Sequence, residues 1–597
     1  MSKVWSILQR WDVLAGLMIA IVVLGVYHRA LWVGFYGDDW IFYHLAGSLS
    51  LPEYVTKYFD PRAQTAWYRP VQGVLFRVEY VLWGGNTVAY HWRNILLHLA
   101  NCLWLLAIIQ RVTRQRTLAL ISALLFAVLP VSAQAVFWPG VVDPLEGFFY
   151  FAAIFFWIAY LQSARRRDYI LAFVVFWLAL FSKEIGVTVP IVLFLIDRCV
   201  IAQSVNVKTL LQRYAAFVGT WLVYLPIEYT AISRSVFINR EGYSPTFHIL
   251  LNLFDYLAAL VFPWLYVPIV NHLGLFIVGV VLIILMVWRK KYFLLPLVAG
   301  AALIILPVTP FPFVAQRFLY VASVVPAILY GWVLTRLTAR ARWLGIVLLS
   351  MLVLLGGWRI ANEANTFGEW ARVARVPFRN VRQAHPALPN DTLLYFINPP
   401  IPGSNLAGMF FWHYGKTVTV KTDEAVPARL RDHAITFVYV FDAQGNQKEL
   451  RVEKNLDARI TVPLPVTFGK SIVLEGFELV SDRIQRGDPL VLLLYWRGAH
   501  RITDDYTVIV QVVDSVGKVA ASYEKAPRRG QLSTSAWRPG ELIVDAIVLP
   551  IDETVVAGTY RLTLALCDAS IGQCVAIRDA HGRMIDEQLT LGEVYLE

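Results

Sequence analysis

Repeated apolar segments of bilayer-spanning length fill the first 358 residues of this 597-residue chain. The hydrocarbon core of a bilayer is about 30 Å thick, and a helix crosses it in about 20 residues. Because the core holds no water, every backbone N–H and C=O there needs a partner, which a helix supplies within one segment. Residues 1–358 are therefore predicted to form a polytopic α-helical membrane domain with about 11 transmembrane helices.

The count of crossings depends on residues 250–270, an apolar stretch that contains Pro263 and Pro268. If this stretch crossed the bilayer fully, the basic loop at 289–291 would move to the side opposite the other basic loops. We therefore expect a re-entrant or peripheral segment, which a membrane protein tolerates where it is buried in protein. The alternative count is about 13, with this stretch and part of loop 34–92 both crossing.

The formal net charge of +11 would suit a nucleic-acid partner, but the positions of the basic residues favour another explanation. Lysines and arginines gather in short loops between apolar runs, for example at 165–167. If the N-terminus, with Lys3 and Arg10, is cytoplasmic, these loops all lie in the cytoplasm, as the positive-inside rule requires. We therefore expect no nucleic-acid partner, a retained helix from Val13 to Val33, and an extracytoplasmic tail.

The tail is strand-rich and divides into two parts. Residues 359–461 mix helical and strand patterns, and 462–597 contain short apolar strands at a spacing typical of a β-sandwich. We expect an extracytoplasmic α/β segment followed by an extracytoplasmic all-β sandwich domain. Cys567 and Cys574 lie in this tail, where a short-loop disulfide is one prediction and two unpaired thiols the other.

The large first outer loop, 34–92, is long and mixes apolar with charged residues. Such segments suit helices that lie in the plane of the interface, with Arg77 and Glu79 on the wet face. Long loops with their own structure are usually functional. This loop begins with two adjacent carboxylates, Asp38 and Asp39, just past the first apolar run.

A carboxylate at the membrane boundary is a functional hypothesis by default. Two adjacent carboxylates repel each other, which raises the pKa of one of them or requires a nearby cation. The alternative is a pair of solvated loop acids. The predicted topology brings several other polar residues to the same outer face, where they could surround one cavity. They are Arg69, His91, Asp143, Glu146, Lys183, Glu184 and Arg317.

These residue types suit transfer of a sugar from polyprenyl phosphate to a hydroxyl. A carboxylate can take the hydroxyl proton as general base, and a single displacement inverts the anomeric carbon. The leaving phosphate gathers negative charge, which cations or a divalent metal ion must meet. The candidates for binding phosphate are Arg69, Lys183, Arg317 and His91, and the candidate metal ligands are Asp143, Glu146 and Glu184. The sequence contains neither GxGxxG nor a P-loop, which agrees with a lipid-linked donor.

Five short motifs occur between residues 1 and 340, in the same order as in the protein family that they resemble. They are Asp38-Asp39, Tyr68-Arg69-Pro70, the set His91, Asn94 and His98, Ser182-Lys183-Glu184, and Arg-x-Leu-Tyr-x-x-Ser at 317–323. In these motifs the chain resembles the GT-C superfamily of integral-membrane glycosyltransferases, especially the protein O-mannosyltransferases and their tetratricopeptide-linked relatives. The resemblance implies a GT-C fold and a polyprenyl-phosphate sugar donor. It also implies that Asp38 is the base, with Asp39 as the second candidate.

The chain departs from that family at Gln316, where a glutamate is usual, and in its tail. It has no tetratricopeptide repeats, and residues 462–597 instead resemble the β-sandwich tails of some bacterial membrane glycosyltransferases. The resemblance implies transfer of a mannose-like sugar to Ser or Thr of a secreted protein, at the outer face of a prokaryotic plasma membrane. A lipid or cell-wall glycan acceptor, as for the aminoarabinose transferases, is the close alternative.

Two readings from other classes stay open. A transporter or flippase of lipid-linked glycan would show pseudo-symmetric halves and broken helices near the bilayer midplane. The sequence shows no such symmetry, and its polar residues gather at the outer ends of helices. A non-catalytic protein that anchors its tail at the surface is the other reading. Of these three classes, we expect the chain to be an enzyme.

Overall fold

The structure is a computed structural model that describes residues 2–597 with a few gaps. The residues left out are 64–66, 202–204, 235–246, 266–272, 289–294, 312, 423–429, 431, 443, 453–463 and 486. The basic loop at 289–291 and the expected boundary between 461 and 462 therefore lie outside the described residues. The chain divides into two compact units, Met1–Val373 and Ala374–Glu597, and each is described by itself.

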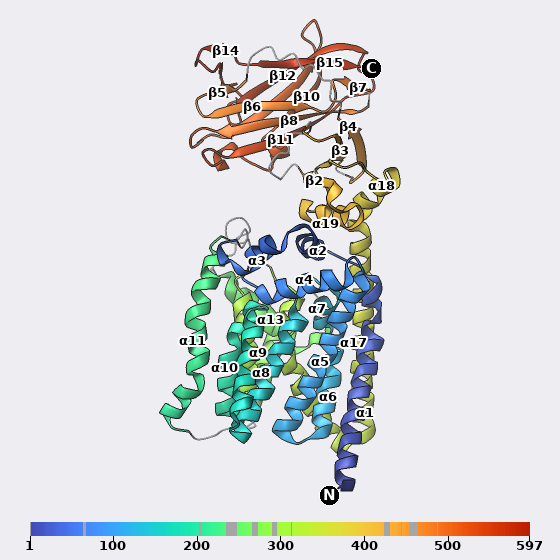
Figure 1. The fold of residues 1–597 in the computed structure, drawn as a ribbon, viewed down its shortest axis with the longest axis vertical. Coiled ribbons are helices and arrows are strands. Elements are labelled where there is room, and N and C mark those ends of the chain that lie inside the picture. The colour runs from blue at the N-terminus through green and yellow to red at the C-terminus, as the bar shows by residue number, and fades with distance from the viewer. Residues whose placement is uncertain are drawn as a thin grey trace. The chain divides into compact units, whose positions relative to one another are not determined.

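The first unit is helical (Figure 1). Its long helices are α1 (Ser2–Tyr27), α5 (Thr87–Thr113), α8 (Asp143–Ser163), α11 (Val207–Ile232) and α17 (Arg342–Ala374). Its shorter helices include α6 (Arg116–Ala127), α7 (Ala133–Phe137), α9 (Arg166–Leu180), α10 (Val189–Leu195), α13 (His248–Val261), α14 (Leu273–Trp288), α15 (Leu295–Ile305) and α16 (Val324–Arg340). Short helical turns complete it, among them η3 (Pro130–Ser132), η4 (Glu184–Thr188) and η9 (Gln316–Leu319).

Within the described residues, five helices are long and apolar enough to cross a membrane, and a sixth span arises if one bent pair is counted together. The N-terminal unit is therefore a multi-helix membrane domain, while the total of about 11 crossings stays a prediction. Helix α13 covers part of the stretch 250–270. Its 14 residues extend about 21 Å, short of the hydrocarbon thickness, which agrees with a segment that does not cross fully.

The bent pair is α6 with the segment from Pro130 to Phe137, and the bend is 54°. Proline at 130 lacks the N–H that a continuing helix needs, so the apolar run breaks there. The carbonyl of Val128 at this break faces Gly356 of α17, where a Cβ atom would overlap it. Gly356 thus lets α17 pack directly on the break.

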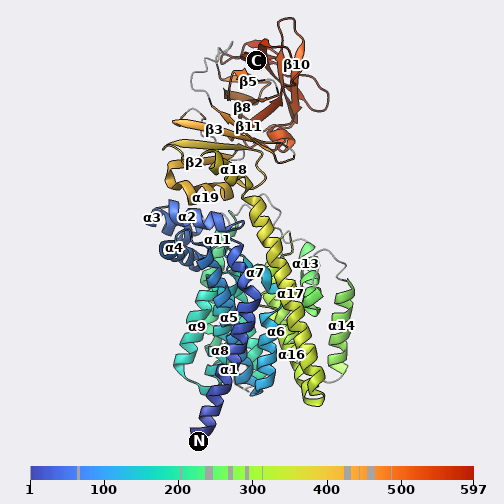
Figure 2. The same ribbon diagram turned by 90° about the vertical axis from the view of Figure 1, so that its right-hand side faces the viewer.

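Three helices of the first outer loop lie across one end of the helical unit: α2 (Asp39–Ser48), α3 (Leu51–Phe59) and α4 (Pro70–Trp83) (Figures 1 and 2). We call this the α2–α4 end. Ser50 and Glu53 form a capping box that starts α3, and Pro70 occupies the first turn of α4. The loop is helical, as predicted, while its position in the membrane interface stays a prediction.

Glu79, however, does not lie on a wet face: it is buried on α4 and pairs with Arg93 of α5 at 3.2 Å. Arg77 donates hydrogen bonds to the carbonyls of Ala46 and Leu49. That part of the interpretation was wrong, because a helix that lies flat on a protein buries the face that it turns toward the protein.

Helix α17 does not end near residue 358 but continues to Ala374. The apolar run stops at Trp358, yet no proline follows before Pro377, and mainly polar residues carry the helix on. Its 33 residues extend about 50 Å, well beyond the hydrocarbon core. The helical unit therefore reaches residue 373, beyond the boundary expected at 358.

The second unit begins with a four-stranded sheet in the order β2-β1-β3-β4, with β1 parallel to both neighbours. Its elements are α18 (Val376–Ala384), β1 (Thr392–Ile397), α19 (Gly403–Tyr414), β2 (Val418–Thr422), β3 (Ile435–Phe441) and β4 (Gln447–Arg451).

Two further sheets form a β-sandwich, with the orders β10-β9-β12-β15-β7 and β11-β8-β6-β5-β13-β14. The strands are β5 (Val466–Phe468), β6 (Ile472–Leu479), β7 (Arg483–Ile484), β8 (Pro489–Gly498), β9 (Tyr506–Val513), β10 (Val519–Lys525), β11 (Leu542–Pro550), β12 (Gly558–Asp568), β13 (Ile577–Arg578), β14 (Met584–Asp586) and β15 (Leu589–Leu596). Cys567 and Cys574 are joined in a disulfide. The C-terminal part is β-rich, as predicted.

Strand β8 is apolar at successive positions because both of its faces are covered. Leu492 and Leu494 face the sandwich core, while Leu493 and Tyr495 pack with Leu393 of the four-stranded sheet. A strand covered on both faces needs apolar side chains at every position. The α/β segment and the sandwich thereby share a core.

We predict that replacing Gly356 by alanine lowers the thermal stability of the purified protein in detergent, because the added methyl meets the Val128 carbonyl. Overpacking of this kind costs about 1–3 kcal/mol. The matched control is Gly357→Ala, whose methyl would meet only the Val26 side chain at 3.4 Å. Equal melting temperatures for the two variants would contradict the close packing of α17 on the break.

Candidate functional site

Charged residues from five separate segments of the helical unit come together at the α2–α4 end. We call them the polar cluster: Asp38, Asp39, Arg69, Asp143, Lys183, Glu184 and Arg317. Two ion pairs and the mutual electrostatic influence of the remaining groups show that they are neighbours. These seven residues are among the nine predicted from the sequence. Glu146 is buried behind the cluster, where the charges of Lys183, Asp143, Glu184 and Arg69 act on it, whereas His91 contacts the Gly34 carbonyl.

Asp39 is fixed in place. Its side chain is buried, and its two oxygens accept hydrogen bonds from the backbone N–H groups of Tyr36, at 2.8 Å, and of Gly140. A Cβ atom at position 140 would lie 2.7 Å from the Asp39 carboxylate, so only glycine allows this approach. Burial raises the pKa of Asp39 well above its usual value, although both N–H groups act in the opposite direction. Asp39 therefore joins two loops and is not free to take a proton from a substrate.

Asp38 differs from its neighbour. Its side chain is exposed, and its carboxylate accepts no hydrogen bond from a described residue. The surrounding protein partly removes the Asp38 carboxylate from water, which raises its pKa, and the guanidinium groups of Arg317 and Arg69 partly offset this rise. Of the two adjacent carboxylates, Asp38 is thus the accessible one, and it lies within the electrostatic influence of two cations. This is the arrangement that a general base requires.

A polar row on α5 positions the loops that carry these groups. His91 Nε2–H donates to the carbonyl of Gly34 at 3.1 Å, so His91 anchors the segment before Asp38 instead of facing an open site. The amide of Asn94 donates to the carbonyls of Ala135 and Trp138, both at 3.1 Å. Lower on the same helix, His98 contacts the hydroxyl of Tyr320 at 2.8 Å.

The loop that carries Gly140 is held from α4 and α5 together. Arg93 donates to the carbonyl of Pro139 at 2.8 Å, and Gln72 donates to that of Gly140 at 3.3 Å. Glu79, paired with Arg93, keeps the guanidinium in place. These contacts to the loop that carries Gly140 were not predicted from the sequence, because Glu79 and Arg93 lie in different helices and look like ordinary surface charges.

Two of the three predicted phosphate-binding cations already have carboxylate partners. Arg69 contacts Glu184 Oε2 through Nε at 3.1 Å and through Nη2 at 2.7 Å. Lys183 forms a buried ion pair with Asp143. Burial alone would raise the pKa of Glu184, but Arg69 and Lys183 outweigh it and hold that pKa below its usual value. These pairs neutralise charges that could not otherwise remain buried.

Arg317 is the exception among the cations. Its half-buried guanidinium forms no ion pair with any described residue and lies over the rings of Trp138, at 5.1 Å, and Phe318, at 4.9 Å. Burial lowers the pKa of Arg317, while Asp143 and Asp38 raise it from a distance. A guanidinium held by aromatic faces, with its donors unused by the described residues, is suited to an anionic ligand.

Glu146 lies fully buried on α8, and neither of its carboxylate oxygens has a hydrogen-bond partner among the described residues. Glu228 of α11 was not singled out from the sequence. It accepts a hydrogen bond from Tyr224 at 3.1 Å, and its charge acts on Arg69. A glutamate four residues after a tyrosine, late in an apolar helix, was the signal that could have identified it.

The predicted metal ligands do not fit a metal site well. No group of three or more His, Cys, Asp or Glu side chains with metal-binding geometry occurs among the described residues. Asp143 and Glu184 each form an ion pair with a cation, and Glu146 is buried near both without a hydrogen-bond partner among the described residues. The three carboxylates are therefore not arranged as ligands of one metal ion.

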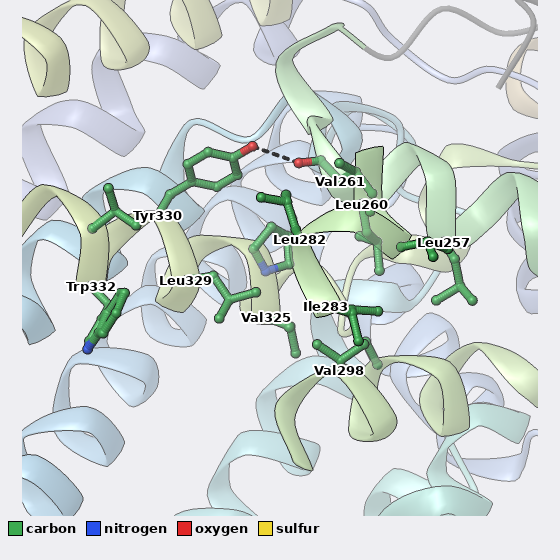
Figure 3. A pocket seen from close by; sticks show the side chains of 15 residues that line it. Leu257, Leu260, Val261, Leu282, Ile283, Val298, Val325, Leu329, Tyr330 and Trp332 are labelled. Atoms are coloured by element: carbon green, nitrogen blue, oxygen red, sulfur yellow. Dashed lines mark hydrogen bonds between the residues drawn. The ribbon is translucent and has the colours of Figure 1, made fainter. Parts of the chain in front are cut away.

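Two apolar cavities lie between the helices, away from the polar cluster. One, of about 300 Å³, is lined by α13, α14, α15 and α16, and its lining side chains are almost all aliphatic (Figure 3). Tyr330 borders it and donates a hydrogen bond to the carbonyl of Val261. The other, of about 420 Å³, is lined by α5, α8, α10, α15 and α16. Neither cavity has polar groups suited to catalysis, but both suit a hydrocarbon chain.

We predict that Lys183→Met destabilises the protein strongly, by about 3–5 kcal/mol, because it leaves Asp143 buried without a partner. Replacing both residues, Lys183→Met with Asp143→Leu, should restore most of that loss. Thermal unfolding in detergent measures both variants. The control is Glu369→Gln, which breaks an exposed pair with Arg372 and should change little. If the double variant is no more stable than Lys183→Met, the ion pair is not what the two residues contribute.

Comparison with known proteins gives limited similarity. No family model matches the chain. A protein O-mannosyl-transferase, TMTC1 of Mus musculus, is 35% identical over 102 residues, which are 17% of this chain and 10% of that protein. The chain thus spans about a tenth of the length of this curated relative. Among solved structures, arabinosyltransferase EmbB from Mycobacterium smegmatis aligns with 96% of this chain and 65% of its own, at 12% identity and a TM-score of 0.27. A TM-score of that size does not establish a shared fold.

Proposed function

We propose that this chain is an inverting glycosyltransferase that moves a sugar from a polyprenyl-phosphate carrier to an acceptor hydroxyl. The observation that carries the proposal is the proximity of an accessible carboxylate, Asp38, to a guanidinium, Arg317, that forms no ion pair with a described carboxylate. The first can accept a proton and the second can bind a phosphate. They lie at one end of a membrane domain, where a lipid carrier presents its head group.

In the proposed reaction Asp38 accepts the proton of the acceptor hydroxyl as its oxygen attacks the anomeric carbon. The bond between that carbon and the phosphate oxygen breaks, and the electron pair leaves with the phosphate. Arg317 binds the phosphate as its negative charge increases. A single displacement of this kind inverts the configuration at the anomeric carbon. The proton on Asp38 then passes to water, to which its carboxyl is exposed.

Arg69 and Lys183 support this step in a different way from that predicted. Each is paired with a carboxylate, so neither supplies a free positive charge to the phosphate. Both remain within electrostatic reach of the other cluster residues, and Arg69 lowers the pKa of Asp38. Their contribution in this proposal is to hold the cluster together, and Arg69 also helps to keep Asp38 ionised.

Three further observations support a lipid-linked donor. The two apolar cavities offer space for a polyprenyl chain. The sequence motifs resemble those of protein O-mannosyltransferases, and the short match to TMTC1 agrees with that family. On this basis we propose mannose or a similar sugar as the transferred group. We place the α2–α4 end at the outer face of a prokaryotic plasma membrane, following the distribution of basic loops.

We predict that Asp38→Asn lowers the rate of transfer at least about 100-fold, the scale of a lost general base. The measurement is transfer of radiolabelled sugar from polyprenyl-phosphate mannose to a membrane extract by purified protein. Asp60→Asn, at the same end but outside the polar cluster, is the control and should keep wild-type activity. Full activity of Asp38→Asn would contradict the assigned base.

A second prediction concerns pH. Because Asp38 must be ionised, activity should rise with pH through its pKa, which lies above the usual value for aspartate. Arg317 lowers that pKa, so Arg317→Gln should shift the acid limb of the pH–rate profile to higher pH in addition to weakening donor binding. Arg317→Lys keeps the charge and should leave the limb near its wild-type position. An acid limb that does not move in Arg317→Gln would show that Asp38 is not the titrating base.

A further inference from the structure

The last turns of α17 carry a tryptophan that the mechanism does not use. Trp370 is 47% exposed, and it lies 28 positions after the first residue of the helix. At a rise of about 1.5 Å per residue this is about 42 Å along α17, beyond a hydrocarbon core of about 30 Å. Trp343 and Trp358, on the same helix, are within the length that a bilayer covers. Trp370 therefore lies past the hydrocarbon core, where its ring can meet water-soluble molecules.

Trp370 begins a row of aromatic rings. Its ring stacks on Tyr36 with the centroids 6.0 Å apart and an interplanar angle of 26°. Phe367 packs beneath both, at 5.4 Å from Trp370 and 5.7 Å from Tyr36. Tyr36 in turn meets Trp138 edge-on at 5.3 Å. The three rings of Tyr36, Trp138 and Trp370, which we call the aromatic row, are all at least partly exposed.

The aromatic row leads to the reacting groups. Arg317 lies over Trp138 at 5.1 Å, and Tyr36 precedes Asp38 by two residues. Burial, together with the charge of Asp38, raises the pKa of the Tyr36 hydroxyl. One end of the row is thus next to the proposed base and the proposed phosphate site, and the other end is the exposed indole of Trp370.

We propose that the aromatic row is a binding subsite for a pyranose ring of the acceptor, so that the accepting hydroxyl is carried by a carbohydrate. This inference rests on the proposed function and specifies its acceptor class. The C–H face of a pyranose packs on an indole or phenol ring, while its hydroxyls can hydrogen-bond to a carboxylate such as Asp38. Exposed aromatic side chains beside a carboxylate and a guanidinium provide both kinds of contact.

The location favours the acceptor over the donor. Neither apolar cavity has a lining residue from α17, so Trp370 lies apart from the surfaces suited to a polyprenyl chain. The donor's phosphate would bind at Arg317, at the opposite end of the aromatic row. An acceptor arriving from water would meet Trp370 first and place its hydroxyl near Asp38.

The test combines binding and kinetics in the full-length protein. Binding of methyl α-D-mannopyranoside, followed by saturation-transfer NMR, uses the Asp38→Asn background so that no reaction occurs. We expect binding to persist there, to be lost on adding Trp370→Ala, and to persist on adding Trp343→Ala, the control on the same helix. In otherwise wild-type protein, Trp370→Ala should raise KM for a mannose-terminated oligosaccharide acceptor about tenfold, the scale of one stacking contact, with kcat and donor KM little changed. Trp370→Phe, which keeps a ring, should recover part of the loss.

Other outcomes overturn the inference. A rise in donor KM with an unchanged acceptor KM would assign the ring to the donor sugar. A defect seen only with a Ser/Thr peptide acceptor, without saccharide binding, would make the acceptor a protein. Equal effects of Trp370→Ala and Trp343→Ala would leave the row without a specific role.

The subsite and the proposed reaction can fail separately. If wild-type protein binds the saccharide through Trp370 but transfers no sugar, the subsite stands and the proposed reaction fails.

Discussion

The carboxylate of Asp39 joins two loops that are far apart in the sequence, and the rest of the candidate site depends on this contact. It accepts one backbone hydrogen bond from Tyr36 and another from Gly140, 101 residues away. A buried carboxylate with fewer donors would be costly, so the two N–H groups and the loops that supply them are held in register. Because Asp39 is held inward, Asp38 is directed outward at the start of α2. The adjacent acids thus have complementary roles: one organises the backbone, and the other stays accessible.

Charge pairing then decides which groups remain available to a ligand. In a poorly hydrated interior an isolated charge is expensive, so Lys183 and Arg69 are neutralised by Asp143 and Glu184. Arg317 is stabilised in another way, by aromatic faces, which interact with its charge without neutralising it. A cluster with several cations and several anions therefore presents one unneutralised guanidinium among the described residues. The cations of the cluster thus differ in whether a carboxylate neutralises them, and this difference leaves Arg317 as the one available to an anionic ligand.

The sequence predicted the two classes of domain and all seven members of the polar cluster, because a charged residue at the end of an apolar run is conspicuous. It could not rank them. Whether Asp38 or Asp39 is accessible depends on the N–H of Gly140, and the partner of Arg69 lies 115 residues away. Periodicity is local, whereas these contacts are set by packing between helices. The same limit explains the error at Glu79, whose burial depends on the surface under α4.

Helix α17 shows how one continuous element links membrane packing to recognition. Gly356 lets the helix pack tightly on the break after α6, which fixes its position inside the membrane domain. Because the helix then continues without interruption, that position also determines where Trp370 meets Tyr36. A flexible linker after residue 358 could not hold an indole at a defined distance from Asp38. The stiffness of the helix is therefore part of the argument for the subsite, since stacking on a sugar requires a ring whose place is set before the ligand arrives.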